Sequence, residues 1–315
     1  MGRGWIHWSG RRKDAASNIV MESLLQAVEE SVPLAEDVPI VAGKFGNVWL
    51  ERWHLFSLDA PSVALAWMWL VARSAGVELP WTEFAAMFLA VWMLYVADRL
   101  LDARPLGDRR VTELERRHHF HHKYRLGFCW GIGFACAGLA ALLPEMPRVE
   151  LERYMLLGIL LVGWFGLIHT VTKPLPKEFM VGIFFAAAVF IAGTVRATGM
   201  GEALLFPAVM LGVVCCLNCV FIYAWESGAG FLARAHHGTK LAARIVVLVA
   251  LGVAGVCGLG FLLPGPGRQI LLACAESALL LLGLHFLRER IEKTSLRAFA
   301  DFALLTPLLA WLWLR

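Results

Sequence analysis

Charged side chains are scarce in this chain of 315 residues, where Asp, Glu, Lys and Arg together make up 17%. Typical soluble domains carry about 25%. Hydrophobic residues, in contrast, reach 59%. This balance excludes an ordinary soluble domain and predicts an integral, multi-pass membrane protein in contact with membrane lipid. Outside one histidine-rich loop no basic run is interleaved with aromatic residues, so no nucleic-acid partner is expected.

Signatures of several other protein classes are also missing. The sequence has no phosphate-binding Walker loop, no dinucleotide-binding glycine fingerprint and no Ser-His-Asp pattern. Its seven cysteines all fall in apolar stretches, where we expect small core residues rather than a disulfide framework. The polar residues that interrupt the apolar stretches are therefore the best candidates for function.

Nine apolar stretches follow a polar N-terminal region, and each is close to the roughly 20 residues that a helix needs to cross a bilayer. They predict an all-α fold, a polytopic membrane helical bundle with about nine transmembrane helices. Residues 1–55 are expected to form a cytoplasmic or interfacial extension, and residues 56–315 the transmembrane domain. Asp59 and Asp301 interrupt the first and last stretches. The expected spans are 58–76, 81–100, 126–144, 154–172, 178–196, 203–225, 241–263, 268–287 and 297–314.

The basic residues are distributed unequally between the two sides of these spans. Twenty-three of the 29 lysines and arginines fall in the N-terminal region and in the loops that follow even-numbered spans. Because short cytoplasmic loops carry an excess of Lys and Arg, the N-terminus and these loops are predicted to be cytoplasmic.

The second span ends in a polar interruption, Asp98-Arg-Leu-Leu-Asp102. Residues four apart share a helix face, and ionisable groups within a membrane are costly unless they line a cavity or bind something. Two carboxylates on one face suit Mg²⁺, which keeps several waters and is shared with substrate phosphates. The alternative is an Asp-Arg cluster among the lipid headgroups.

The sixth span ends in a second interruption with the same layout. Asn218 and Glu226 lie eight residues apart on one helix face, with Tyr223 beside them. If the ends of the second and sixth spans face each other, oxygen ligands from both would line a cavity open to the cytoplasm. Alternatively, Asn218 forms a hydrogen bond between helices and Glu226 lies in water at the end of the span.

Two lysines bracket a stiff turn between the fourth and fifth spans, Lys173-Pro-Leu-Pro-Lys177. Their ammonium groups would face the same cytoplasmic surface as the carboxylates. Lysine binds phosphate as a point charge, so the pair suits a diphosphate. The alternative is that both are ordinary lysines of a cytoplasmic loop.

Together these features resemble the UbiA superfamily of intramembrane prenyltransferases, as a divergent member, from about residue 55 to the end. The resemblance implies transfer of an isoprenoid group from a polyprenyl diphosphate donor to a lipophilic acceptor within the membrane, with Mg²⁺ as cofactor. Asp98, Asp102, Asn218 and Glu226 would bind the metal. Lys173, Lys177 and Arg99 would contact the diphosphate. Tyr95 and Tyr223 would stabilise the allylic carbocation through their rings.

Two features depart from the family pattern. The first motif usually opens with Asn-Asp, whereas the matching positions here are Leu94 and Tyr95. The second motif normally has several Asp, whereas this chain offers Asn218 and Glu226. Three carboxylates and one amide suit one Mg²⁺ ion better than two.

Histidines support a competing hypothesis. His118, His121 and His122 match one histidine box of the integral-membrane di-iron oxygenases, and His236 and His237 lie in another cytoplasmic loop. That class needs about eight histidines in three boxes. Beyond these five and His119, the remaining four, at 7, 54, 169 and 285, are scattered. The same loop could instead contact anionic headgroups. A third hypothesis is a non-catalytic transporter or scaffold of the same fold.

Overall fold

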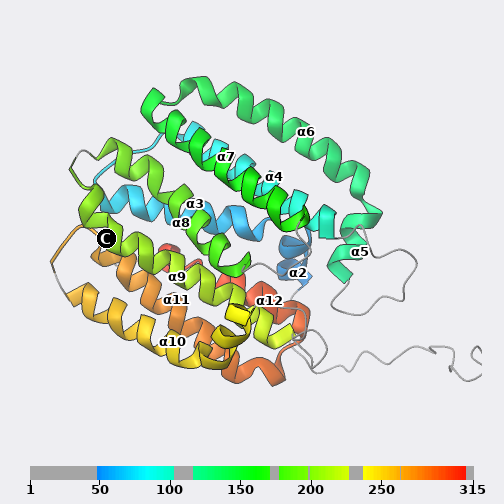
Figure 1. Ribbon diagram of the computed structural model, residues 1–315, viewed down its shortest axis with the longest axis vertical. Helices are drawn as coiled ribbons and strands as arrows, with labels where there is room; N and C mark the ends of the chain where they lie inside the picture. The colour runs from blue at the N-terminus through cyan, green and yellow to red at the C-terminus, as the bar shows by residue number, and fades with distance from the viewer. Residues whose placement is uncertain are drawn as a thin grey trace, which may run out of the picture. The chain divides into compact units, whose positions relative to one another are not determined.

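The structure, a computed structural model, describes residues 48–102, 116–170, 177–197, 199–226, 237–262 and 264–309, and these contain no β-strand (Figure 1). The helices are α2 (Val48–Leu55), α3 (Asp59–Ser74), α4 (Trp81–Asp102), α5 (Arg116–Lys123), α6 (Arg125–Leu142), η3 (Leu143–Glu145), α7 (Arg148–Thr170), α8 (Lys177–Arg196), α9 (Gly201–Glu226), α10 (His237–Leu262), α11 (Arg268–Leu287), η5 (Arg288–Arg290) and α12 (Lys293–Phe302).

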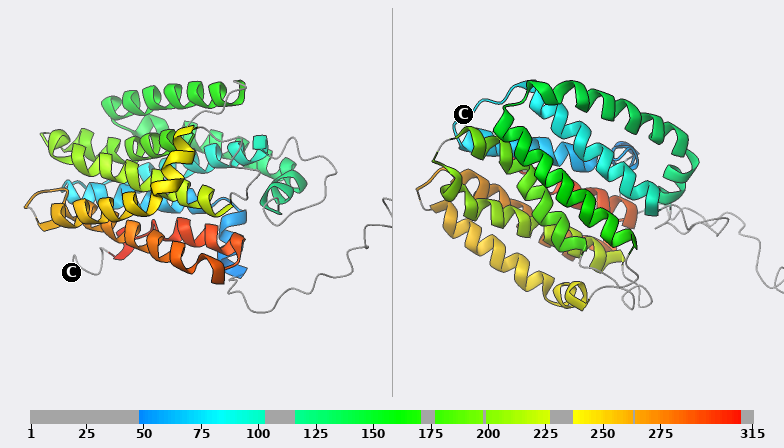
Figure 2. Two further views of the ribbon diagram at one scale, coloured as in Figure 1. Left: turned by 60° about the horizontal axis from the view of Figure 1, so that its bottom comes forward. Right: turned by 45° about the horizontal axis from the view of Figure 1, so that its top comes forward.

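Seven helices are long and apolar enough to cross a membrane. They lie side by side in one bundle, with α6 along one edge and α10 along the other (Figures 1 and 2). The predicted all-α, multi-pass membrane protein is confirmed at this level. The seven segments coincide with the second to eighth expected spans: Trp81–Leu101, Arg125–Glu145, Arg148–Ile168, Lys177–Arg196, Gly201–Trp225, His237–Leu262 and Arg268–Arg290.

The first expected span, 58–76, forms the shorter helix α3, with 16 residues. At 1.5 Å per residue it is about 24 Å long, less than the roughly 30 Å of a hydrocarbon core. It ends because Gly76 adopts a positive φ of 68°, and the amides of Gly76 and Val77 bond back to the carbonyls of Arg73 and Ala72. This is the Schellman arrangement that terminates many helices.

Helix α3 forms the centre of the bundle rather than a lipid-facing wall. It contacts α4, α8, α11 and α12, and the side chains of Trp67, Met68 and Leu70 are completely buried. A hydropathy pattern cannot distinguish such a core helix from a span in lipid, because both are apolar on most faces.

The last expected span, 297–314, is not one continuous helix over its described part. Helix α12 ends at Phe302, and turns follow from Ala303 to Thr306. Pro307 explains the break, because a proline in a helix lacks the N–H that would bond to residue 303 and clashes with that carbonyl. Trp67 uses the break by donating its indole N–H to the carbonyl of Leu304 at 2.8 Å. Residues 310–315 lie outside the described part.

The N-terminal extension was expected to reach residue 55, and residues 1–47 lie outside the described part. Helix α2, which covers the rest of that expected extension, packs against α5 and α12. Its His54 forms an ion pair with Asp59 of α3. The helical unit therefore includes α2.

A buried ion cluster ties three helices together at the end of the bundle where α4 and α7 begin. The guanidinium of Arg196, in the last turn of α8, pairs with Glu83 of α4 and lies 3.2 Å from Glu150 of α7. Both carboxylates are in first helical turns, where the positive end of the helix dipole favours them. The cluster holds α7, whose described side chains after Glu150 are all partly or fully exposed, onto the bundle.

Helices α8 and α9 cross closely at Gly182, and this contact yields a first prediction. A Cβ at Gly182 would overlap the carbonyl of Gly212 and the sulfur of Cys216. We expect Gly182→Ala to lower stability by about 1–3 kcal/mol, the usual cost of overpacking, in thermal unfolding of the detergent-purified protein. Gly158→Ala is the control, because a Cβ there meets nothing within 4 Å and alanine favours a helix. Equal melting temperatures for the two variants would contradict the close crossing.

Candidate functional site: a buried polar cluster between five helices

Six polar side chains meet inside the bundle near the end where α4 and α9 terminate. Helices α2, α3, α4, α9 and α12 contribute to this polar cluster. Its members are His54, Asp59, Tyr95, Arg99, Asn218 and Asp301. Charged groups in an apolar interior require partners, so the contacts of each member indicate what the cluster can do.

The centre of the cluster is an ion pair between Asp59 and two basic side chains. His54 Nδ1 lies 2.6 Å from Asp59 Oδ2, and Arg99 Nη2 donates to the same oxygen at 3.0 Å. The backbone amide of Ala60 donates to the other carboxylate oxygen at 3.1 Å. His54, Asp59 and Arg99 are at most 3% exposed, so Asp59 is a buried carboxylate whose oxygens both receive donors.

Arg99 also fixes the turn between α2 and α3. Its Nη1 donates to the carbonyl of His54 at 2.5 Å and to the hydroxyl of Ser57 at 3.1 Å. Ser57 has a positive φ of 59°, which a non-glycine residue adopts only where its surroundings enforce it. One guanidinium therefore holds this strained turn and neutralises the buried carboxylate beside it.

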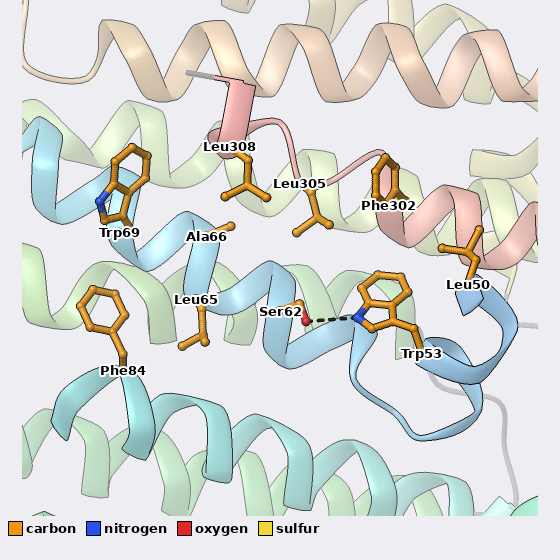
Figure 3. Close-up of a pocket in the computed structure, with 10 residues that line it drawn as sticks. All are labelled: Leu50, Trp53, Ser62, Leu65, Ala66, Trp69, Phe84, Phe302, Leu305 and Leu308. Carbon is orange, nitrogen blue, oxygen red and sulfur yellow. Dashed lines mark hydrogen bonds between the residues drawn. The ribbon is translucent and has the colours of Figure 1, made fainter. Parts of the chain in front are cut away.

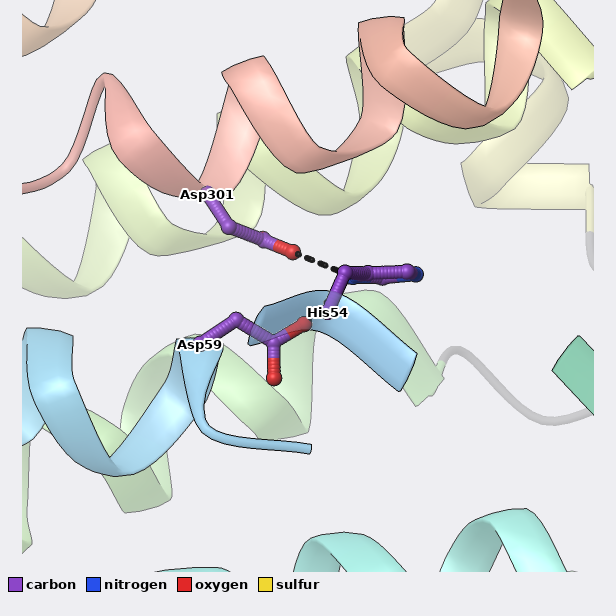
Figure 4. Close-up of side chains that lie close together, drawn as sticks. All are labelled: His54, Asp59 and Asp301. Atoms are coloured by element: carbon purple, nitrogen blue, oxygen red, sulfur yellow. Dashed lines mark hydrogen bonds and ion pairs between the residues drawn. The ribbon is translucent and has the colours of Figure 1, made fainter. Parts of the chain in front are cut away.

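Asp301 joins the cluster from α12. Its Oδ1 accepts a hydrogen bond from the amide nitrogen of Asn218 at 3.0 Å, and its Oδ2 lies 3.6 Å from His54 Nδ1. Figure 4 shows His54, Asp59 and Asp301 converging from three helices. Among the described residues, Asp301 Oδ2 and Asn218 Oδ1 are buried oxygens without a hydrogen-bond donor.

An apolar groove runs along the outside of the same helices. It has a volume of about 690 Å³, within the usual range for ligand sites. Figure 3 shows Trp53 at one end, with its indole N–H bonded to Ser62, and Trp69 and Phe84 at the other. Trp53 precedes His54 and Phe302 follows Asp301, so the groove and the polar cluster share α2 and α12.

The structure places three of the predicted site residues in the polar cluster. Tyr95 donates its hydroxyl to Asp59 at 3.4 Å, and the Arg99 guanidinium carbon lies 4.2 Å from the centre of its ring. Asn218 reaches the cluster through Asp301. The second and sixth expected spans are therefore linked through Asp59, His54 and Asp301, which belong to three other helices.

The other predicted residues lie around this cluster or outside the described part. Asp98 is half-buried on α4, Tyr223 is half-buried on α9, and Lys177 is exposed at the start of α8. Asp102 and Glu226 end α4 and α9, but their side chains, and all of Lys173, lie outside the described residues.

For Mg²⁺, the described members of the expected ligand set fit in part. The buried Asn218 Oδ1 has no donor among the described side chains, so it is available as an oxygen ligand. Asp98 lies on the half-buried face of α4, and carboxylate and amide oxygens are ligands that Mg²⁺ accepts.

Three of the five histidines of the competing hypothesis have described side chains. His121 is buried, stacked on Phe128 with ring centres 4.5 Å apart, and its Nε2 lies 3.1 Å from the hydroxyl of Ser57. His122 and His237 are exposed. The side chains of His118 and His236 lie outside the described residues. As placed, His121 and His122 do not converge on one ion.

Sequence reasoning missed three central residues, His54, Asp59 and Asp301. The two aspartates gave a signal, because each interrupts an apolar stretch, but nothing in the sequence indicates that the first and last stretches meet. His54 was one of four scattered histidines and gave no signal. No family model matches the chain, and it has no significant match among curated proteins or solved structures.

Proposed function

We propose that the protein is a Mg²⁺-dependent prenyltransferase of the UbiA type, which transfers an isoprenoid group from a polyprenyl diphosphate to a lipophilic acceptor. In this proposal α3 and the segment from α12 onward complete nine spans, and the polar cluster lies toward the cytoplasm. The observation that carries the proposal is that α4 and α9, which each bear one expected ligand motif, both contribute side chains to the polar cluster.

The remaining ligands of both motifs lie beyond the polar cluster, toward the same end of the bundle. On α4, Asp102 is seven residues past Tyr95, or about 10 Å along the helix. On α9, Glu226 is eight residues past Asn218, or about 12 Å. Both helices end at these residues. The two motifs therefore end at similar distances past the polar cluster along their helices, and in this proposal they share one metal–diphosphate site.

The apolar groove supports a lipophilic substrate. Its lining is aliphatic and aromatic apart from Ser62, whose hydroxyl is occupied by Trp53 and by the carbonyl of Leu58. An isoprenoid chain has no hydrogen-bonding groups, so such a lining suits it. The groove and the polar cluster share α2 and α12, which would place the apolar chain near the charged end of the donor.

Bound Mg²⁺ would take up the negative charge that builds on the leaving diphosphate. Helix α8 begins at the end of the bundle where α4 terminates. Lys177, its first residue, is exposed there and would add a positive charge. The Tyr95 ring stabilises positive charge, and the apolar walls exclude water from a carbocation. Arg99 is engaged by Asp59, His54 and Ser57, so in this proposal it positions α4 rather than binding diphosphate.

Thermal unfolding with a non-hydrolysable geranylgeranyl diphosphate analogue tests the proposal. A ligand that binds only the folded state stabilises it by about 2.7 kcal/mol at a hundredfold excess over Kd. We expect a rise in melting temperature that requires Mg²⁺ and is lost in Asp98→Asn. Glu145→Gln is the matched control, because Glu145 is an exposed carboxylate after α6 at the opposite end.

Two results would contradict the proposal. If Asp98→Asn keeps the Mg²⁺-dependent rise, the diphosphate does not bind at this motif. If analogues of several chain lengths leave the wild-type melting temperature unchanged, the chain has no donor site. The third hypothesis, a non-catalytic membrane protein, would then be favoured.

A further inference from the structure

We propose that His54, Asp59 and Asp301 bind one first-row transition-metal ion, with Asn218 Oδ1 as a further ligand. This site does not include Asp98 or Asp102, and it takes Asn218 out of the expected Mg²⁺ ligand set, which then consists of Asp98, Asp102 and Glu226. The inference does not depend on the isoprenoid chemistry. Its four ligands come from helices α2, α3, α9 and α12.

The first argument is convergence. One nitrogen of His54 and one carboxylate oxygen from each aspartate lie within 4.8 Å of one another. They come from α2, α3 and α12, and Figure 4 shows the three side chains directed toward a common point. Three protein ligands with one or more positions left for water or another ligand is a common arrangement for a transition metal.

The second argument is the set of oxygens without donors. Asp301 Oδ2 and Asn218 Oδ1 are buried and have no hydrogen-bond donor among the described residues. Asn218 is 6% exposed, and its amide nitrogen is already bonded to Asp301. A buried polar atom left unsatisfied costs about 1–3 kcal/mol. A cation between these oxygens and His54 would satisfy both at once.

The ligand types decide which ions are suitable. Imidazole nitrogen together with carboxylate oxygen suits Zn²⁺, Fe²⁺, Co²⁺ or Mn²⁺, whereas Mg²⁺ prefers oxygen ligands alone. The donors to Asp59, from Arg99 and the Ala60 amide, resemble the outer contacts that orient carboxylate ligands in metal sites.

Charge leaves one competing arrangement. Arg99 neutralises one of the two carboxylates, and Arg297, one turn before Asp301, lies within electrostatic range of Arg99. With His54 neutral, these two arginines already balance the two carboxylates without a metal. A divalent ion on neutral His54 instead leaves an excess positive charge, which an anionic ligand in the open coordination position would balance. Metal content distinguishes these arrangements.

The experiment uses the full chain purified in detergent, freed of its affinity tag and of metal, and titrated with Co²⁺. We expect one equivalent to bind with visible d–d absorption that excess Mg²⁺ does not remove. Asp301→Asn and His54→Gln should each weaken Co²⁺ binding by tenfold or more. Asp98→Asn, at the separate Mg²⁺ motif, and His122→Gln, an exposed histidine on α5, should bind Co²⁺ as the wild type does.

Two outcomes would overturn the inference. The first is a folded wild-type protein that binds no equimolar Co²⁺, which would leave the two arginines as the balancing charges. The second is unchanged Co²⁺ binding in folded Asp301→Asn, an isosteric variant chosen to limit disruption. The wild-type titration alone can overturn the inference, so the inference remains testable even if a variant fails to fold. Loss of diphosphate binding alone would affect only the proposed function.

Discussion

Replacing Arg99 with methionine should destabilise the protein by about 3–5 kcal/mol, the usual effect of removing one partner of a buried ion pair. The guanidinium is 3.0 Å from Asp59, whose carboxylate is completely buried. Without Arg99 this carboxylate would keep His54 and lose its permanent cation. The same substitution removes the donors to the His54 carbonyl and the Ser57 hydroxyl, so the strained turn at Ser57 would lose its support as well.

Thermal unfolding with a thiol-reactive dye measures this effect, because Cys215, Cys257 and Cys274 are buried in the folded protein and react once it unfolds. Arg73→Met is the control, since Arg73 is an exposed arginine at the end of α3. A second test adds Asp59→Asn to Arg99→Met. Removing the uncompensated charge should recover part of the lost stability, a coupling that only interacting residues show. An Arg99→Met protein as stable as Arg73→Met would refute the central role of the pair.

The seven long helices could be predicted because each is a run of about 20 apolar residues bounded by polar ones. The first and last expected spans differ from the prediction for reasons that their amino-acid composition does not encode. Helix α3 is apolar because protein surrounds it, as the complete burial of Trp67 shows. Helix α12 ends because of Pro307. In the turn that follows, the carbonyl of Leu304 accepts a hydrogen bond from Trp67, which lies 237 residues away in the sequence.

The site could be predicted only where local spacing carries information. Helix periodicity placed Asp98 and Asp102, which flank Arg99, on one face of the second span, and Asn218 and Glu226 on one face of the sixth. The partners of these residues come from elsewhere in the sequence. Asp59 lies 40 residues from Arg99, and Asp301 lies 83 residues from Asn218. Pairings at such separations depend on which helices pack together, and no single-sequence periodicity encodes that packing.

At each end of the bundle an arginine pairs with one or two buried carboxylates of neighbouring helices. At one end Arg99 of α4 secures α2 and α3, and at the other Arg196 of α8 secures α4 and α7. The two ends differ in the number of basic side chains for each carboxylate. Arg99 shares the one carboxylate it contacts, that of Asp59, with His54, whereas Arg196 faces both Glu83 and Glu150. Among the described residues, Glu83 and Glu150 have no second basic partner in an ion pair. We therefore expect removal of Arg196 to weaken the attachment of α7 most.

Arg196→Met should therefore destabilise the protein and loosen α7 in particular. Arg196 is about a quarter exposed, while both glutamates are buried, so the loss should lie between the roughly 1 kcal/mol of an exposed pair and the 3–5 kcal/mol of a buried one. A further polar attachment between the described parts of α7 and α8 is the bond from Tyr154 to the carbonyl of Ala188.

Hydrogen exchange of the first turns of α7, read beside thermal unfolding, separates local loosening from general instability. We expect faster exchange around Glu150 and Tyr154 than in α10 or α11, and partial recovery when Glu150→Gln is added, because that removes one uncompensated charge. Arg148→Met is the matched control, as Arg148 is an exposed arginine at the start of α7. If exchange rises equally in all helices, Arg196 contributes to overall stability alone. A rise confined to α7 would mean that a single ion cluster decides whether this helix stays with the bundle.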